Sequence, residues 1–185
     1  MMKRGFKANS TRLALEIRAE FHVAIEGQFD PYEFAVEYGI PVVELGTLEG
    51  PARDHFYHST SGTLSGALIK NGNGFAILDN DAHPTTRRRA TISHEISHYL
   101  LEHEFASVLS SNERGCGIEA EQEEEAKFLS GELLIPTEGA IRHALKGRGD
   151  EQVARFHGVS GELARWRMNV SGARLIAHRA RGKSA

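Results

Sequence analysis

The chain has 185 residues, enough for one domain with a sizeable core, and its 40% share of hydrophobic residues is ordinary for a globular protein. Its formal net charge of -3 excludes the strong overall field of a nucleic-acid or membrane binder. The single cysteine, Cys116, excludes an internal disulfide framework and favours a reducing compartment. There is no apolar run near the roughly 18 residues of a membrane span, and no apolar signal segment at the N-terminus. We therefore expect a soluble cytoplasmic protein.

The first part of the chain predicts two helices and a short strand. Apolar residues recur at spacings of three and four over residues 8–26, which indicates a helix. Asp30-Pro31 is a typical helix start, and the helix that begins there is expected to end near Tyr38-Gly39. A short strand is expected over residues 40–45. Residues 46–62 contain Gly, Pro and Ser at short intervals and are expected to form a loop.

Two strands and a long helix are expected next. The strands, over residues 64–70 and 75–79, flank Asn71-Gly72-Asn73-Gly74, which favours a hairpin because both residue types tolerate positive φ. Pro84 closes the loop that follows the second strand. A helix is then expected over residues 86–102.

The second half of the chain is expected to be helical. A helix over residues 119–134 should stop before Pro136, and short helices separated by glycines should follow. Residues 102–138 hold ten acidic and two basic side chains, whereas residues 139–185 hold ten basic and three acidic ones. We expect a main domain over residues 1–138 and a helical C-terminal extension over residues 139–185, packed on it and ending in a basic tail.

The sequence His94-Glu95-Ile96-Ser97-His98 has the spacing of a metal-binding helix. Residues four apart lie one above the other, so His94 and His98 present two imidazoles to one point, as a tetrahedral zinc ion requires. Glu95 lies about 100° further round the helix, where it can take a proton from metal-bound water. Apolar residues occupy the opposite side of this helix, which predicts that this side is buried in the core. The alternative is a pair of surface histidines without a metal.

A catalytic zinc site needs a third protein ligand, and the acidic run of the next helix offers candidates. Most acidic runs are solvated helix faces, but at 100° per residue Glu123 falls within the apolar arc of that helix. A carboxylate on a buried face needs a partner, and a metal ion supplies one. We predict Glu123 as the third ligand, with Glu119 as the alternative. The other glutamates of the run point away from this arc: Glu121, Glu124 and Glu125.

These motifs together resemble the ImmA/IrrE family of zinc metallopeptidases. The resemblance rests on HEISHYLL, on Glu-x-Glu-Ala from Glu123 and on Leu-Leu-Ile-Pro from Leu133. It extends to Arg4-Gly5-Phe6-Lys7-Ala8, to Tyr38-Gly39-Ile40-Pro41-Val42, to the arginines before the HExxH helix and to Phe156-His157-Gly158-Val159-Ser160. It implies an α+β fold of the small, gluzincin-like zincin type, with a short, partly antiparallel sheet packed by helices. It also implies His94, His98 and Glu123 as Zn²⁺ ligands and Glu95 as the catalytic residue.

The resemblance implies a zinc-dependent endopeptidase that cleaves a helix-turn-helix repressor or an antitoxin. This chain departs from the family pattern at Ser97, where a small residue such as Gly is usual, and at Lys127, where Asn or Asp is usual. We expect Lys127 on the metal-facing stripe, where an ammonium cannot orient a ligand as a carboxylate does but can pair with Glu123. The alternative function is a zinc-stabilised regulator that binds a repressor or DNA without proteolysis.

Residues 152–169 have the outline of a helix-turn-helix, with Arg165, Trp166 and Arg167 on the second helix. Two packed helices with a basic surface are the more common meaning of this pattern, with Trp166 as a core anchor. Direct nucleic-acid binding through the basic C-terminal region is therefore the less favoured interpretation, and no membrane partner is expected.

The group that would stabilise a developing oxyanion is left open by the sequence. Tyr99 is chemically suitable but is predicted to face the core. His103 falls about 140° from the His94 and His98 face and is predicted to be a surface residue. Cys116 is expected in a surface loop rather than on the zinc ion. The remaining candidates for the oxyanion are His143, His157 and His178.

Overall fold

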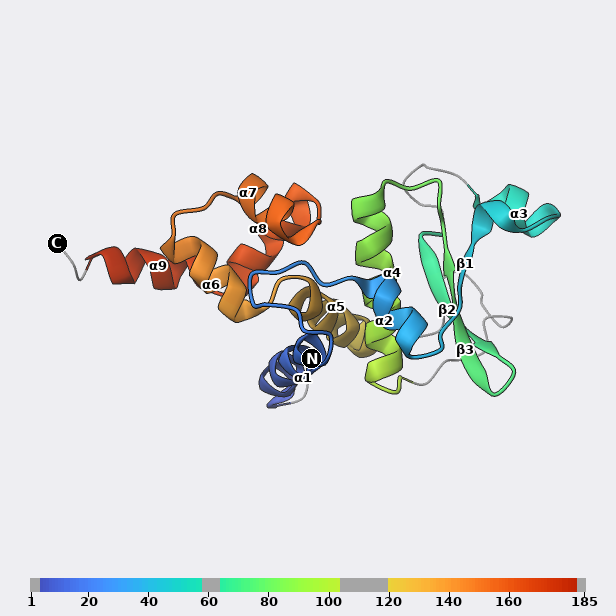
Figure 1. The fold of residues 1–185 in the computed structure, drawn as a ribbon, viewed down its shortest axis with the longest axis horizontal. Coiled ribbons are helices and arrows are strands. Elements are labelled where there is room, and N and C mark those ends of the chain that lie inside the picture. The colour runs from blue at the N-terminus through green and yellow to red at the C-terminus, as the bar shows by residue number, and fades with distance from the viewer. Residues whose placement is uncertain (1–3, 58–63, 104–119, 183–185) are drawn as a thin grey trace.

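A small mixed sheet forms one end of the molecule (Figure 1). Its strands lie in the order β1-β3-β2, with β1 parallel and β2 antiparallel to β3, so the expected partly antiparallel sheet is present. Gly72 has a φ of 58°, as the predicted hairpin turn requires. The strand bounds are β1 (Val42–Glu44), β2 (Gly66–Asn71) and β3 (Gly74–Asp79). The computed structural model describes residues 4–57, 64–103 and 120–182.

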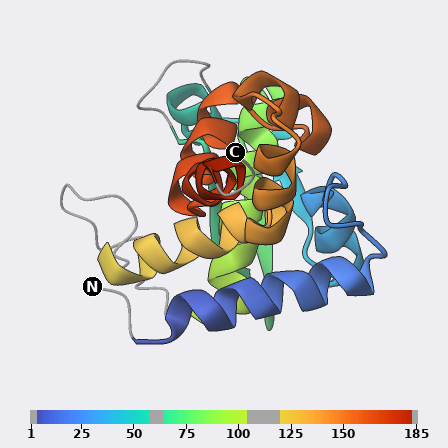
Figure 2. The ribbon, with the colours of Figure 1, turned by 90° about the vertical axis from the view of Figure 1, so that its left-hand side faces the viewer.

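Three helices continue the fold in layers away from this sheet. α4 (Thr85–Leu100) packs on the sheet, α5 (Ala120–Leu134) packs on α4, and α1 (Phe6–Glu20) packs on α5. Figure 2 shows α1 and α5 side by side. Ile92 and Ile96 on α4 are fully buried in the same core cluster as Leu129 and Leu133 of α5. α4 is therefore covered by the sheet, by α5 and also by α2.

The second helix begins and ends where the sequence predicts. α2 (Pro31–Glu37) has Asp30 as its N-cap, and the Asp30 carboxylate accepts a hydrogen bond of 3.0 Å from the Tyr32 N–H. Tyr38 follows as the C-cap, and Gly39 has a φ of 64°. These residues confirm both boundaries.

The first helix is shorter than predicted, because it ends at Glu20 rather than near residue 26. The buried Arg18 guanidinium donates hydrogen bonds to the carbonyls of Ala24 (2.6 Å), Gly27 (2.8 Å) and Leu133 (2.7 Å). If the helix continued past Ala24, the Ala24 carbonyl would point along the helix axis and bond to an N–H of the same helix, not to Arg18. The chain instead turns after His22, which has a φ of 54°, and wraps around the arginine.

The predicted loop over residues 46–62 is wrong in part, because it contains a helix, and residues 58–62 of it lie outside the described part of the chain. α3 (Pro51–Phe56) begins with Pro51 at its first position, after a Gly50 N-cap, and a 3-10 turn, η1 (Leu45–Thr47), precedes it. Proline at the start of a helix removes an N–H that has no partner there. The Gly50-Pro51 pair was therefore a helix start in a segment that its composition assigned to loop.

The C-terminal region consists of short helices, as predicted, and the connections contain Gly147, Gly158 and Gly172 with φ between 63° and 70°. Their bounds are α6 (Thr137–Leu145), α7 (Asp150–His157), α8 (Gly161–Val170) and α9 (Ala173–Gly182). None of the helices in the described part of the chain has the length and apolar character needed to cross a membrane.

A buried ion pair connects α8 to α5. The Arg167 guanidinium donates a 2.8 Å hydrogen bond to Glu132 Oε1, and both side chains are 0% exposed. Arg167 Nε donates to the carbonyl of Ile135 (3.0 Å), and Glu132 also accepts from the N–H and hydroxyl of Thr137 (2.9 and 2.6 Å). The charges are thus paired and hydrogen-bonded, which a buried pair requires.

Removing one partner of this pair should strongly destabilise the protein. We expect Glu132→Ala to lower the free energy of unfolding by about 3–5 kcal/mol, because Arg167 is left buried without its counter-charge. Urea unfolding followed by circular dichroism measures this. Glu124→Ala, at an exposed position of the same helix, should change the value by less than about 0.5 kcal/mol. Equal stability of the two variants would contradict the interpretation.

Candidate metal centre

His94 and His98 of α4 and Glu123 of α5 meet at the contact between the two helices. Their candidate ligand atoms all lie within 4.8 Å of one another. The two Nε2 atoms are 3.1 Å apart, Glu123 Oε2 is 3.2 Å from His94 Nε2, and Glu123 Oε1 is 3.3 Å from His98 Nε2. Two imidazole nitrogens and a carboxylate therefore converge on one point. The structure brings the three sequence-predicted ligands together into a group that can hold a metal ion.

Small buried residues allow the two helices to come this close. Ser93 and Ser97 on α4 are both 0% exposed, and the Ser93 hydroxyl is 3.4 Å from the Ser130 carbonyl of α5. The Ser97 hydroxyl donates a 2.8 Å hydrogen bond to the Ser93 carbonyl on its own helix. Serine in place of the expected small residue therefore leaves no unpaired hydroxyl at this contact.

The charge of Glu123 suits a metal ligand. Its contacts with His94 and His98 hold the pKa of the Glu123 carboxyl well below its usual range, although partial burial acts in the opposite direction. The side chain is 44% exposed, so it lies at an open edge of the site. The carboxylate is consequently ionised at neutral pH, the form in which it binds metals.

Glu95 lies beside the metal-ligand group and is held by the sheet. Its Oε2 accepts a 2.9 Å hydrogen bond from the N–H of Leu68 on strand β2, an edge strand of the sheet. Burial raises the pKa of Glu95, while His94 and His98 lower it. A carboxyl with a raised pKa is a better proton acceptor near neutral pH than an ordinary glutamate.

His103 is buried, so its prediction as a surface residue was wrong. α4 ends at Leu100, Glu102 has a left-handed φ of 52°, and the N–H of His103 bonds to the carbonyl of His98 at 3.1 Å. This helix termination turns the chain back towards α4. The helical-wheel angle does not apply to a residue beyond the end of its helix. His103 Nδ1 is 2.8 Å from His98 Nδ1, and the His103 residue is 7% exposed.

Glu125 is also buried, contrary to the expectation that it points away from the buried face of α5. It is 8% exposed, and its Oε2 lies 3.4 Å from His103 Nε2. α1 covers a second side of α5, so a larger part of its circumference is buried than one apolar arc indicates. The signal in the sequence was that apolar residues fall on more than one side of this helix, at Phe128, Leu129, Leu133 and Leu134.

Lys127 is not paired with Glu123 by any ion pair among the described residues. It is exposed, and its Nζ lies 5.4 Å from the centre of the Trp166 ring of α8. Trp166 packs on α5 at Gly131, where a Cβ would lie 2.7 Å from the ring. Lys127 and Trp166 thus belong to the contact between α5 and α8. Trp166 is half-buried and lies outside the buried core cluster, so it packs between two helices rather than serving as the predicted core anchor.

The candidates for oxyanion stabilisation are engaged elsewhere. His143 and His157 are both 0% exposed, and their Nε2 atoms face each other at 3.0 Å. The second ring nitrogen of His143 is 2.8 Å from the Arg148 guanidinium. Tyr99 packs edge-on against Phe75, with ring centres 5.7 Å apart, as expected of a core-facing residue. None of these residues is in the metal-ligand group.

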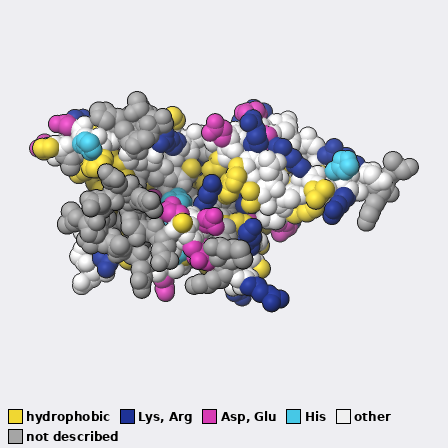
Figure 3. Space-filling view, turned by 180° about the vertical axis from the view of Figure 1, so that it is seen from behind, with side chains coloured by type: hydrophobic (Ala, Val, Ile, Leu, Met, Phe, Trp, Pro, Cys, Tyr) yellow, Lys and Arg dark blue, Asp and Glu magenta, His cyan; other side chains and the backbone are white. Residues whose placement is uncertain are grey.

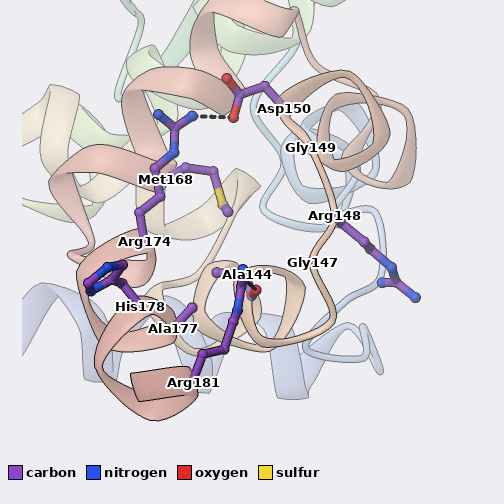
Figure 4. A pocket seen from close by; sticks show the side chains of 10 residues that line it. All are labelled: Ala144, Gly147, Arg148, Gly149, Asp150, Met168, Arg174, Ala177, His178 and Arg181. Atoms are coloured by element: carbon purple, nitrogen blue, oxygen red, sulfur yellow. Dashed lines mark hydrogen bonds and ion pairs between the residues drawn. The ribbon is translucent and has the colours of Figure 1, made fainter. Parts of the chain in front are cut away.

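A cavity of about 430 Å³ lies among the C-terminal helices, and Figure 4 shows the side chains around it. His178 lies at this cavity, on α9. Arg174 forms an ion pair with Asp150, and Arg181 donates a 3.0 Å hydrogen bond to the Ala144 carbonyl. The cationic groups of the cavity therefore already have partners, and its lining contains no set of metal ligands.

Several basic side chains of the C-terminal region are paired with carboxylates. Arg167 is buried with Glu132, and Arg165 is 3.5 Å from Asp150. On the face that Figure 3 presents, Lys and Arg side chains of this half of the molecule are scattered rather than joined in one patch. Of the three residues that a DNA-reading α8 would present, Arg167 is unavailable.

Two residues named from the sequence, Glu119 and Cys116, lie outside the described part of the chain.

Most of the chain matches a known protein family. A family model described as the IrrE N-terminal-like domain (Peptidase_M78) matches residues 35–169, more than half of the chain. The matched region runs from α2 to α8 and includes all three residues of the metal-ligand group as well as Glu95. No curated protein matches the chain.

The metal-ligand group should bind one divalent ion per chain. We expect His98→Ala and Glu123→Ala each to weaken zinc affinity by at least about 100-fold, because each removes one of three protein ligands. Competition with a chromophoric chelator measures this. Glu121→Ala, on the same helix but outside the group, serves as the control and should bind like the natural protein. Unchanged affinity in the Glu123 variant would contradict its place in the site.

Acid should destabilise the protein through the buried His157. Burial lowers its pKa to about 4, against 6.5 in an unfolded chain, and the charged form is therefore favoured in the unfolded state. The unfolded state binds more protons between these values, so stability falls as pH falls from about 7 to about 4, by about 2 kcal/mol at pH 5. Urea unfolding of the metal-free protein across this range tests the prediction. An equally steep slope in His157→Gln would contradict it.

Proposed function

This chain belongs to the Peptidase_M78 family of metallopeptidases, and we propose that it is a zinc-dependent endopeptidase acting on a regulatory protein. The observation that carries the proposal is the convergence of His94, His98 and Glu123 next to the carboxylate of Glu95. A metal ligand group beside a proton acceptor is what hydrolysis of a peptide bond by an activated water requires.

The ligand set fits zinc. Two imidazoles and one carboxylate are a common protein ligand set for a catalytic zinc ion, and three protein ligands leave one position for water or substrate. Bound there, zinc supplies a Lewis acid that polarises a carbonyl and acidifies its water. His94 is partly exposed and Glu123 is 44% exposed, so the site has an open side.

Glu95 is the proposed general base. Its carboxylate is held by the Leu68 N–H at 2.9 Å, which fixes one oxygen and leaves the other to accept a proton from the attacking water. The same carboxyl then returns that proton to the amine that leaves. Its raised pKa favours both transfers, because the carboxyl has to gain and lose the proton in one cycle.

The sheet supports an extended peptide substrate. β2 pairs with β3 on one side, and no strand in the described part of the chain pairs with its other side. Leu68 lies on β2, so a peptide added along this edge would pass beside Glu95. Binding through main-chain hydrogen bonds suits cleavage within a chain, since it does not require a substrate terminus. This supports an endopeptidase rather than an exopeptidase.

We propose a helix-turn-helix repressor or an antitoxin as the substrate, on the basis of the resemblance to ImmA/IrrE peptidases, and the cytoplasm as the place of action. The alternative, a zinc-stabilised regulator without proteolysis, drew on Lys127 and on the basic C-terminal region. Lys127 contacts Trp166, and Arg167 is buried with Glu132. With these residues engaged in packing, the peptidase is the better supported of the two.

Loss of the general base should separate metal binding from turnover. We expect Glu95→Gln to bind zinc with affinity within a few-fold of the natural protein, because Glu95 is not a ligand. Its peptidase rate should fall by at least about 100-fold, the contribution of a general base. The measurement is intact-mass analysis of a repressor encoded next to this protein's gene, incubated with each zinc-loaded enzyme.

Three outcomes of this experiment bear on the proposal. Fragments formed by the natural enzyme and absent with Glu95→Gln support it. Equal turnover by both proteins would exclude Glu95 as the base. A stable complex between the natural protein and the repressor, without fragments at any enzyme concentration, would favour the non-catalytic regulator.

A further inference from the structure

Behind the metal-facing side of His98 lies a line of three buried side chains. His98 Nδ1 is 2.8 Å from His103 Nδ1, and His103 Nε2 is 3.4 Å from Glu125 Oε2. The side chains of His98, His103 and Glu125 are 1%, 5% and 11% exposed. They come from the end of α4, from the turn that follows it and from α5. Side chains from three separate segments of the chain are therefore in line with one candidate metal ligand, His98.

The directions of the protons follow from the role of His98. Its Nε2 faces His94 and Glu123, so in a metal-bound His98 the ring proton is on Nδ1. That N–H can donate only to an acceptor, and the atom opposite it is His103 Nδ1. His103 must then carry its own proton on Nε2, which is the atom that faces Glu125. His98 therefore donates to His103, and the N–H of His103 lies on the side of the Glu125 carboxylate, 3.4 Å from Oε2.

The backbone holds His103 in this place. Glu102 has a φ of 52°, which is unusual for a residue other than glycine, and two hydrogen bonds close the turn: Glu102 N–H to Tyr99 (3.1 Å) and His103 N–H to His98 (3.1 Å). In this conformation the His103 ring faces the His98 ring, with ring centres 5.0 Å apart.

We propose that His103 and Glu125 are positioning residues for the metal site: they fix the ring orientation and tautomer of His98 so that its Nε2 stays directed at the metal ion. This rests on the proposed function, because it assumes that His98 is a zinc ligand. A histidine ligand commonly donates its second N–H to a carboxylate or to another acceptor, and loss of that acceptor commonly costs about 10–100-fold in metal affinity. Here the acceptor is a second histidine, itself next to a carboxylate.

The first test compares two substitutions of His103. His103→Leu removes the acceptor and should weaken zinc affinity by about 10–100-fold in chelator competition. His103→Gln keeps an acceptor oxygen and should recover most of the lost affinity. The cobalt-substituted proteins supply a spectroscopic readout, because the visible bands of the Leu variant should shift when His98 is no longer held. Zinc affinity and cobalt spectrum of His103→Leu that equal those of the natural protein would overturn the proposal.

The second test uses a matched pair on α5. Glu125→Leu should weaken zinc binding in the same direction as His103→Leu. Glu124→Leu removes the same charge from an exposed neighbour and should have no effect on affinity. Equal affinities of the two glutamate variants would remove Glu125 from the proposal.

A third measurement needs no variant and so does not depend on variant folding. Nitrogen-15 NMR of the zinc-loaded natural protein should show His98 protonated on Nδ1 and His103 protonated on Nε2. A His103 protonated on Nδ1 would overturn the proposal. Failure of the natural protein to bind zinc would instead contradict the proposed function, which keeps the two failures distinct.

Discussion

The contact between α4 and α5 is the constraint on which the rest of the structure depends. One helix supplies His94 and His98 and the other supplies Glu123, so the metal-ligand group exists only while the two helices stay in register. Fully buried serines keep the helices close on one side of the contact, and Ile92, Ile96, Leu129 and Leu133 supply its apolar part. Because interiors are close-packed, a shift of either helix along the other would need the repacking of this whole set.

Buried arginines extend this constraint to the rest of the chain. Arg18 of α1 donates to the Leu133 carbonyl at the end of α5, and Arg167 of α8 bonds to Glu132 one residue earlier. The C-terminal part of α5 is thus held from two directions by charged groups that tolerate little displacement, since an unpaired buried charge is costly. The family match ends at residue 169, just after Arg167, and so includes this connection. The division of the chain at residue 138 stays a prediction.

Local patterns were sufficient for the parts of the fold that local physics determines. Asp30-Pro31, the Asn-Gly hairpin and the apolar period of α4 each depend on neighbours within a few residues, and each was predictable. The end of α1 was not predictable, because it depends on hydrogen bonds from Arg18 to carbonyl groups of the turn that follows the helix. The metal-ligand group followed from two helical wheels, because all three of its residues lie inside regular helices.

His103 and Glu125 show where that method stops. His103 lies beyond the end of α4, and its position depends on one left-handed residue, Glu102, for which the sequence carries no glycine as a marker. Glu125 is buried because α1 packs on α5 from a second side, a fact of tertiary structure. A helical wheel assigns each residue one direction but does not say how many neighbours surround the helix. Residues that support a metal ligand from behind are therefore harder to predict than the ligands themselves. Their positions depend on how three segments pack together, whereas the positions of the ligands follow from the periodicity of single helices.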